Sequence, residues 1–279
     1  MDKWLSSVLS FDTQLDTWGR KRSVKKALPL ITRLFLIATF IEDSVRGLVQ
    51  RKLQVQFLEY HYRLPFFFAA VFLYTWIFTA TVASVCIVLR WHEDGAALVL
   101  IGYVTLQQLL YGKYAPSTLG KWGFLVRNLC LCGSLLIIVA SSRLKKGYAL
   151  LPGWSKKTGS ASRFPEYIQL ASRCLMALLS LEFVASMGWI GTVLSLPVVL
   201  FVLVGFKTRL CSLLLMMLYA IHNVLQSAFW YFRGTSWEAM VERDVKLFEF
   251  VQTISIMGGL GLLSSSGPGA LSFDERKKY

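Results

Sequence analysis

The sequence predicts an all-α fold: a polytopic membrane helix bundle of about eight transmembrane helices, arranged as two parallel four-helix repeats. Two observations predict the bundle. Hydrophobic residues make up 55% of the 279 positions and charged residues only 16%, against about 25% charged residues in an ordinary soluble domain. The apolar residues also come in long runs, which must be helical because lipid offers the backbone no hydrogen-bond partners. A third observation, the recurrence of polar residues in both halves, predicts the repeats.

Eight apolar segments can be drawn along the chain. Several are only 17–18 residues long and reach about 27 Å as helices, which suits the thin bilayer of the endoplasmic reticulum. The third segment is short, and the fifth and sixth segments meet at a tight joint near Met187-Gly188. The segments are residues 28–49, 65–89, 95–111, 122–141, 166–188, 189–206, 210–232 and 247–264.

The basic residues predict the orientation. Lysines and arginines bunch in short loops beside apolar segments, and they are more numerous on one side of the membrane if both termini lie on that side. Because basic loops stay in the cytosol, we expect both termini to be cytosolic, which requires an even number of spans. This pattern accounts for the formal net charge of +14, and nucleic acid is not an expected partner.

The two halves carry matching polar residues. Arg33 and Glu42 are nine positions apart in the first segment, as are Arg173 and Glu182 in the fifth. Gln107-Gln108 corresponds to His222-Asn223 at the same offset, and residues 124–142 align with 248–266. Two repeats of four spans have the same orientation and leave a possible site at their interface. The expected divisions are a basic N-tail (1–27), a first repeat (28–142), a cytosolic linker (143–165), a second repeat (166–265) and a C-tail (266–279).

Polar side chains gather near the predicted lumenal ends of the spans. Charges inside a span cost roughly 2.5–3.5 kcal/mol and usually face the bundle interior. We interpret the set as a lumen-facing pocket that binds something cationic, because its acids outnumber its bases. Its members are Glu42, Asp43, Arg46, Arg127, Asn128, Glu182, Asn223, Gln226, Trp230, Glu249 and Gln252.

The alternative is that these residues are structural ion pairs. Arg46 follows Asp43 by three residues and Glu42 by four, so a local ion pair on one helix could form. Arg127 could pair with Glu249 across two helices. The sequence leaves the choice between a pocket and ion pairs open.

Two further expectations concern side-chain placement. Positions 223, 226, 227 and 230 share a helical face, so Trp230 could form a pocket wall beside Asn223 and Gln226. Arg33 and Arg173 lie nearer the cytosolic ends and are expected to extend toward the lipid headgroups.

The glycines and the cysteines point to packing. Gly133, Gly258, Gly259 and Gly261 permit close helix contact. The five cysteines form no CxxC motif, and we read them as buried thiols rather than a disulfide framework or a redox centre. The three histidines are not spaced as ligand pairs, so no metal and no cofactor are expected.

The C-terminus is basic. Arg276 and Lys277 stand at the fourth and third positions from the end, a place that resembles the dibasic signal for retrieval from the Golgi to the endoplasmic reticulum. Such a signal is a receptor-read address and not an anchor. The alternative is a solvated basic tail.

Six stretches of the chain carry a resemblance to a known family. They are LIATFIEDSVR (36–46), FLVRNL (124–129), GFKTRL (205–210), NVLQSAFW (223–230), FVQTISIMGG (250–259) and GPGALSFDER (267–276). In these motifs and in their order, from about residue 28 to the C-terminus, the chain resembles the surfeit locus protein 4 family of endoplasmic-reticulum cargo receptors, within the DoxX-like superfamily.

The resemblance implies a receptor without catalytic activity. Its expected partners are soluble secretory cargo proteins, coat-protein-I and coat-protein-II components and the lipid bilayer, and its expected place is the endoplasmic reticulum membrane, cycling to the cis-Golgi. Cargo recognition in the family is thought to involve the new N-terminus of the mature cargo, which would suit the acidic lumenal set. Two alternatives are a membrane transporter or lipid-handling protein, and a redox enzyme suggested by the DoxX-like kinship, for which the dispersed cysteines and histidines supply no centre.

Overall fold

The computed structural model describes residues 22–113, 122–149, 164–232, 236–266 and 272–273. Every regular element within these ranges is a helix, so the all-α prediction is confirmed there. In chain order the elements are α2 (Arg22–Val49), α3 (Arg51–Tyr62), α4 (Phe66–Leu89), α5 (Glu93–Tyr111), α6 (Gly123–Ala149), α7 (Phe164–Ala177), α8 (Leu179–Val204), α9 (Thr208–Gln226), the short 3-10 helix η2 (Phe229–Tyr231) and α10 (Trp237–Ser266).

Four helices among the described residues are long and apolar enough to cross a membrane. They cover Phe66–Leu89, Gly123–Leu144, Thr208–Tyr231 and Ala239–Ser266, and Gly188–Val204 is a shorter apolar helix. α2 falls outside this set although it is 28 residues long, since Arg33, Glu42, Asp43 and Arg46 interrupt its apolar sequence. The chain is therefore a helical membrane protein, while the number of eight spans stays a prediction.

The predicted joint between the fifth and sixth segments is confirmed. α8 contains a break at Gly188, where φ is 59° and ψ is −137°. A residue with a Cβ rarely adopts this backbone conformation, so glycine permits the change of direction. The fifth segment accordingly comprises α7 and the start of α8, and the sixth is the remainder of α8.

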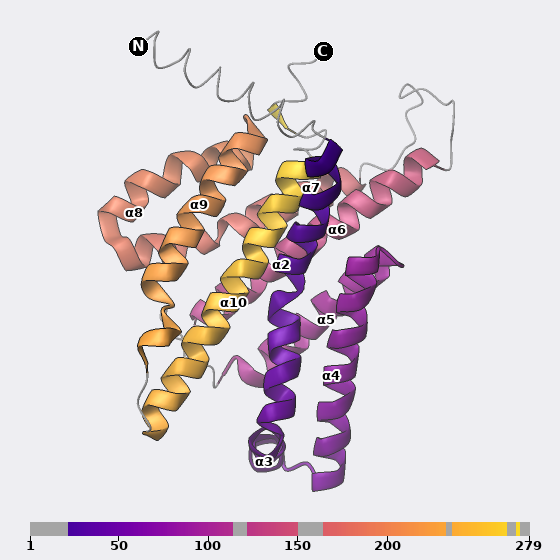
Figure 1. Cartoon of the computed structure of the whole chain (residues 1–279), viewed down its shortest axis with the longest axis vertical. Coiled ribbons are helices and arrows are strands. Elements are labelled where there is room, and N and C mark those ends of the chain that lie inside the picture. The colour runs from indigo at the N-terminus through magenta and orange to yellow at the C-terminus, as the bar shows by residue number, and fades with distance from the viewer. Residues whose placement is uncertain (1–21, 114–121, 150–163, 233–235, 267–271, 274–279) are drawn as a thin grey trace.

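Helix α3 was not predicted, because residues 50–64 contain no long apolar run. Val55 and Leu58 on one side of α3 are buried against Ala69, Leu73 and Ile77 of α4. Figure 1 shows α3 end-on at the end of α2, so it lies across the bundle rather than along it. We call this end of the bundle, where α2 ends and α10 begins, the α3 end.

Among the described helices, α2 and α10 are the first and the last in the sequence, and they lie side by side (Figure 1). A Cβ added to Gly258 would lie 2.5 Å from the backbone nitrogen of Leu36 and 2.6 Å from the carbonyl oxygen of Thr32. The hydroxyl of Ser255 accepts a 3.0 Å hydrogen bond from the backbone N–H of Thr39. The prediction that the glycines permit close contact is confirmed here and at Gly133 of α6, whose Cβ would lie 2.6 Å from that of Leu175 on α7.

The prediction that Arg33 and Arg173 extend toward the headgroups is wrong. Arg33 is 3% exposed, forms an ion pair with Glu93 and donates a 2.7 Å hydrogen bond to the carbonyl of Ile87. Arg173 is fully buried, and a Cβ on Gly205 would lie 2.5 Å from its Nη1. Both guanidinium groups thus lie at helix–helix turns, and for Arg33 a carbonyl oxygen and a carboxylate replace the water that headgroups would supply.

Candidate functional site

A cavity of about 230 Å³ lies at the α3 end, between α2, α3, α4, α5, α6 and α10. Its walls combine a few polar groups with many aromatic rings, which is typical of ligand pockets. The polar residues are Asp43, Arg46, Gln54 and Gln107; the aromatic ones are Phe57, Trp76, Tyr103, Tyr111, Phe124 and Phe248; Gly47, Leu73, Ile77 and Val245 complete the lining.

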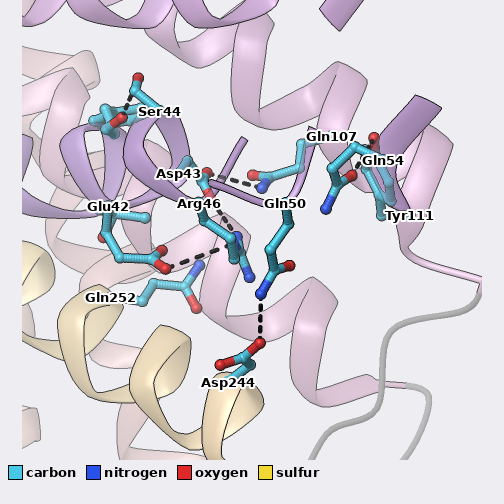
Figure 2. A network of polar contacts seen from close by, with 12 residues as sticks. Glu42, Asp43, Ser44, Arg46, Gln50, Gln54, Gln107, Tyr111, Asp244 and Gln252 are labelled. Carbon is cyan, nitrogen blue, oxygen red and sulfur yellow. Dashed lines mark hydrogen bonds and ion pairs between the residues drawn. The ribbon is translucent and has the colours of Figure 1, made fainter. Parts of the chain in front are cut away.

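Asp43 is the acidic group of this cavity. Its side chain is 4% exposed, and its Oδ1 forms an ion pair with Arg46 of the same helix. Its Oδ2 accepts a 2.9 Å hydrogen bond from Nε2 of Gln107 on α5 (Figure 2). Both oxygens of the carboxylate are therefore engaged.

Arg46 is held by three groups. Besides Asp43, its Nε lies 3.5 Å from Oε1 of Glu42, and its guanidinium carbon lies 4.9 Å above the ring of Phe248 on α10. The local ion pair that the spacing allows is present. Since Arg46 also lines the cavity and its side chain is 26% exposed, the pair belongs to the wall of a possible binding site.

The unpredicted helix α3 forms another wall. Gln54 accepts a 3.2 Å hydrogen bond from the hydroxyl of Tyr111, and the ring of Phe57 stacks on Tyr111 at 5.1 Å. Gln50, just before α3, donates a 2.6 Å hydrogen bond to Asp244 of α10 (Figure 2). The signal that could have found this wall is the spacing of Gln54, Phe57 and Leu58, which repeats at three and four residues as on a helix face.

A second polar cluster centres on Arg127 of α6. Its Nε donates to Glu182 of α8 at 3.1 Å, while its Nη1 donates to the carbonyl oxygen of Glu249 at 2.9 Å and to Thr253 at 3.1 Å. The carboxylate of Glu249 accepts from Lys246 at 3.2 Å. Of the alternatives left open by the sequence, Arg127 meets only the backbone carbonyl of Glu249, and Glu182 supplies the carboxylate, because burial of Arg127 beside α8 brings that group within reach.

A row of amides crosses the bundle beside these clusters. Asn128 donates to Gln108 at 2.9 Å, and Gln252 donates to Asn128 at 2.8 Å, which joins α5, α6 and α10. Asn223 donates to the carbonyl oxygen of Phe250 at 3.0 Å. None of these amides lines the cavity, and the same holds for Glu182 and Glu249.

The predicted face shared by Asn223, Gln226 and Trp230 does not form. α9 ends at Gln226, which is exposed, and Trp230 falls in η2. The Trp230 ring packs edge-on against Phe250 at 5.7 Å and is not part of the cavity. The predicted retrieval residues Arg276 and Lys277 lie outside the described residues.

The family model and similar curated proteins point to the same family. The model of the SURF4 family matches residues 12–279. The chain is similar to the ER-derived vesicles protein ERV29 of Saccharomyces cerevisiae, with 32% identity over 257 residues, 91% of this chain and 78% of that protein.

It is also similar to the Surfeit locus protein 4 homologs of Drosophila melanogaster and Schizosaccharomyces pombe. The first is 32% identical over 91% of each chain. The second is 29% identical over 90% of this chain and 82% of its own length. No solved structure matches the chain significantly.

Proposed function

The chain belongs to the SURF4 family, and from that premise we propose that it is a receptor that binds soluble secretory proteins in the lumen of the endoplasmic reticulum and carries them into vesicles bound for the Golgi. The observation that carries this proposal is the similarity, over 91% of the chain, to a protein named for vesicles derived from the endoplasmic reticulum. A helical membrane protein suits the task, since it must connect lumenal cargo with a cytosolic coat.

The cavity at the α3 end is the proposed cargo site, and the α3 end faces the lumen. Six aromatic rings suit an apolar side chain of the cargo. Asp43, with Glu42 beside it, suits a cationic group, such as the free amino terminus of a mature secretory protein. The remaining members of the predicted set, from the Arg127 cluster to the amide row, would hold the helices that form the walls.

We retain the proposal of two parallel repeats, with residues 28–142 and 166–265 as the repeats and 143–165 as the linker. Two contacts support it. Arg33 contacts the α4–α5 turn while Arg173 contacts the α8–α9 turn, at the positions that the alignment of the halves pairs. α2 packs on α10 as α7 packs on α6, so the first helix of each half meets the last helix of the other.

Recycling would use the C-tail. With both termini cytosolic, Arg276 and Lys277 would be read by coat-protein-I components, and coat-protein-II components would load the receptor outward. The receptor would then reside in the endoplasmic reticulum membrane and cycle through the cis-Golgi.

The experiment measures location and secretion together. The protein is tagged at its N-terminus, and wild type is imaged beside the double variant Arg276→Ser, Lys277→Ser, while secretion of a panel of soluble proteins is measured after depletion. We expect the variant to move to the Golgi and depletion to reduce secretion of a subset of the panel. An unmoved variant together with normal secretion would contradict the proposal and favour a transporter.

The site is tested separately, by cargo capture from a lumenal extract. The double variant Glu42→Gln, Asp43→Asn should lose cargo capture, because it removes the negative charge at the cavity. It should remain folded. Glu249→Gln serves as the matched control, since that carboxylate pairs with Lys246 away from the cavity. Undiminished capture by the first variant would contradict the assignment of the cavity.

A further inference from the structure

The acidic group of the cavity is already occupied by the protein itself. Asp43 holds Arg46 with one oxygen and Gln107 with the other. The side chain of Asp43 is only 4% exposed, and each of its oxygens already has one donor, although a carboxylate oxygen can accept another. A cationic ligand that approaches Asp43 is repelled by Arg46, which carries the same charge, so the ligand binds best by displacing that donor.

Arg46 has a second position available on its own helix. Its Nε already lies 3.5 Å from Oε1 of Glu42, one residue before Asp43. The guanidinium group carries five N–H donors on a long side chain. A rotation of this side chain alone would transfer it from Asp43 to Glu42, and no helix would have to move.

The facing helix supplies a further acceptor at that second position. α2 and α10 run antiparallel, with Leu36 against Gly258, Thr39 against Ser255 and Arg46 against Phe248. The same register places Gln252 opposite Glu42, and Figure 2 shows the two side chains beside Arg46.

Two buried oxygens there accept no hydrogen bond from any described residue: Oε2 of Glu42 and Oε1 of Gln252. Gln252 is fully buried. A buried acceptor without a donor is uncommon and calls for an explanation. A guanidinium that moved from Asp43 to this place would satisfy both oxygens.

The charges also favour two states. In the ion pairs around Arg46, two carboxylates face one guanidinium. One positive charge is missing for balance, so a single ammonium group from a ligand could bind Asp43 while Arg46 remains on Glu42.

We propose that Arg46 is a tethered competitor for cargo: its guanidinium holds Asp43 in the empty receptor and moves onto Glu42 and Gln252 when a cationic group of the cargo takes Asp43. This inference rests on the proposed function of the cavity. It makes Arg46 a specificity-determining residue, because a ligand without a positive charge gains nothing by displacing it.

The test uses the full chain in lipid nanodiscs and a fluorescent peptide, Phe-Ala-Leu extended by a labelled spacer, either with a free amino terminus or N-acetylated. Arg46→Gln removes the competing charge but keeps a polar side chain. We expect Arg46→Gln to bind the free-amine peptide about tenfold more tightly than wild type, within the range of ordinary coupling between competing groups. The acetylated peptide should show no such gain.

The matched control is Lys246→Gln, which removes one positive charge from α10 at a residue that pairs with Glu249 and does not line the cavity. It should bind both peptides as wild type does. If Arg46→Gln binds the free-amine peptide no more tightly than wild type, or if the acetylated peptide gains equally, the proposal is wrong.

A double-mutant cycle tests the second position of Arg46. Glu42→Gln should weaken binding of the free-amine peptide when Arg46 is present, because the displaced guanidinium loses its acceptor, and should have little effect in the Arg46→Gln background. An equal loss in both backgrounds would overturn the proposal. If no peptide binds any variant, the proposed role of Arg46 is wrong. The receptor function is still tested independently by the secretion experiment.

Discussion

The Asp43–Arg46 pair and the Arg127–Glu182 pair join the same two chemical groups in different settings. The first lies on one helix, at a spacing of three residues, and its arginine side chain is 26% exposed at a cavity. The second joins α6 to α8, and both side chains are at most 5% exposed. A pair within one helix can open without separating helices, whereas a buried pair between helices cannot. Location, rather than chemistry, therefore separates a candidate binding group from a structural one.

The largest expected effect comes from breaking the structural pair. Arg127→Leu leaves the carboxylate of Glu182 buried without its guanidinium, which should lower the free energy of unfolding by about 3–5 kcal/mol. Thermal unfolding of the purified protein measures this. The double variant Arg127→Leu, Glu182→Leu should recover part of the loss, and a single variant as stable as wild type would remove the contrast between the two pairs.

The next effect concerns the contact between α2 and α10 that both proposals need. Gly258→Ala places a Cβ 2.5 Å from a backbone atom of α2, so the helices must separate, at a cost of about 2 kcal/mol. Gly102→Ala is the matched control, because nothing lies within 4 Å of its added Cβ. Equal unfolding temperatures for the two variants would argue against the close contact.

Asp43→Asn should destabilise the protein less than Arg127→Leu, by about 1.5 kcal/mol, since Arg46 keeps Glu42 as a partner. Cargo capture should nevertheless be lost. Unfolding and cargo capture should be measured on the same preparation. If Asp43→Asn lowers the free energy of unfolding as much as Arg127→Leu does, Asp43 is a structural residue.

The smallest expected effect is that of Tyr111→Phe. It removes the hydroxyl that donates to Gln54 of α3, which costs about 1 kcal/mol or less. Global unfolding should barely change, but amide hydrogen exchange in residues 51–62 should become faster than in wild type. Unchanged exchange in α3 would mean that the apolar contacts with α4 alone hold this wall.

Local spacing explains what could be predicted of the site. The pairing of Arg46 with Asp43 was foreseeable because three residues along a helix always bring side chains together. Helical spacing does not extend from Asn223 to Trp230, because α9 ends at Gln226. The partner of Arg127 cannot be read from spacing either, since Glu182 and Glu249 are both distant in sequence and only the packing of α8 and α10 against α6 sets their distances.

The long apolar runs, the break at Gly188 and the glycines in the tight helix contacts could all be inferred from the residues alone, because backbone hydrogen bonding in lipid and the absence of a Cβ leave few alternatives. The helix α3 across the bundle, the inward turn of Arg33 to Glu93 and the cavity beside Asp43 depend instead on the tertiary structure. These features depend on which surfaces of distant segments pack together. A buried charged side chain points toward the polar partner that this packing places within reach.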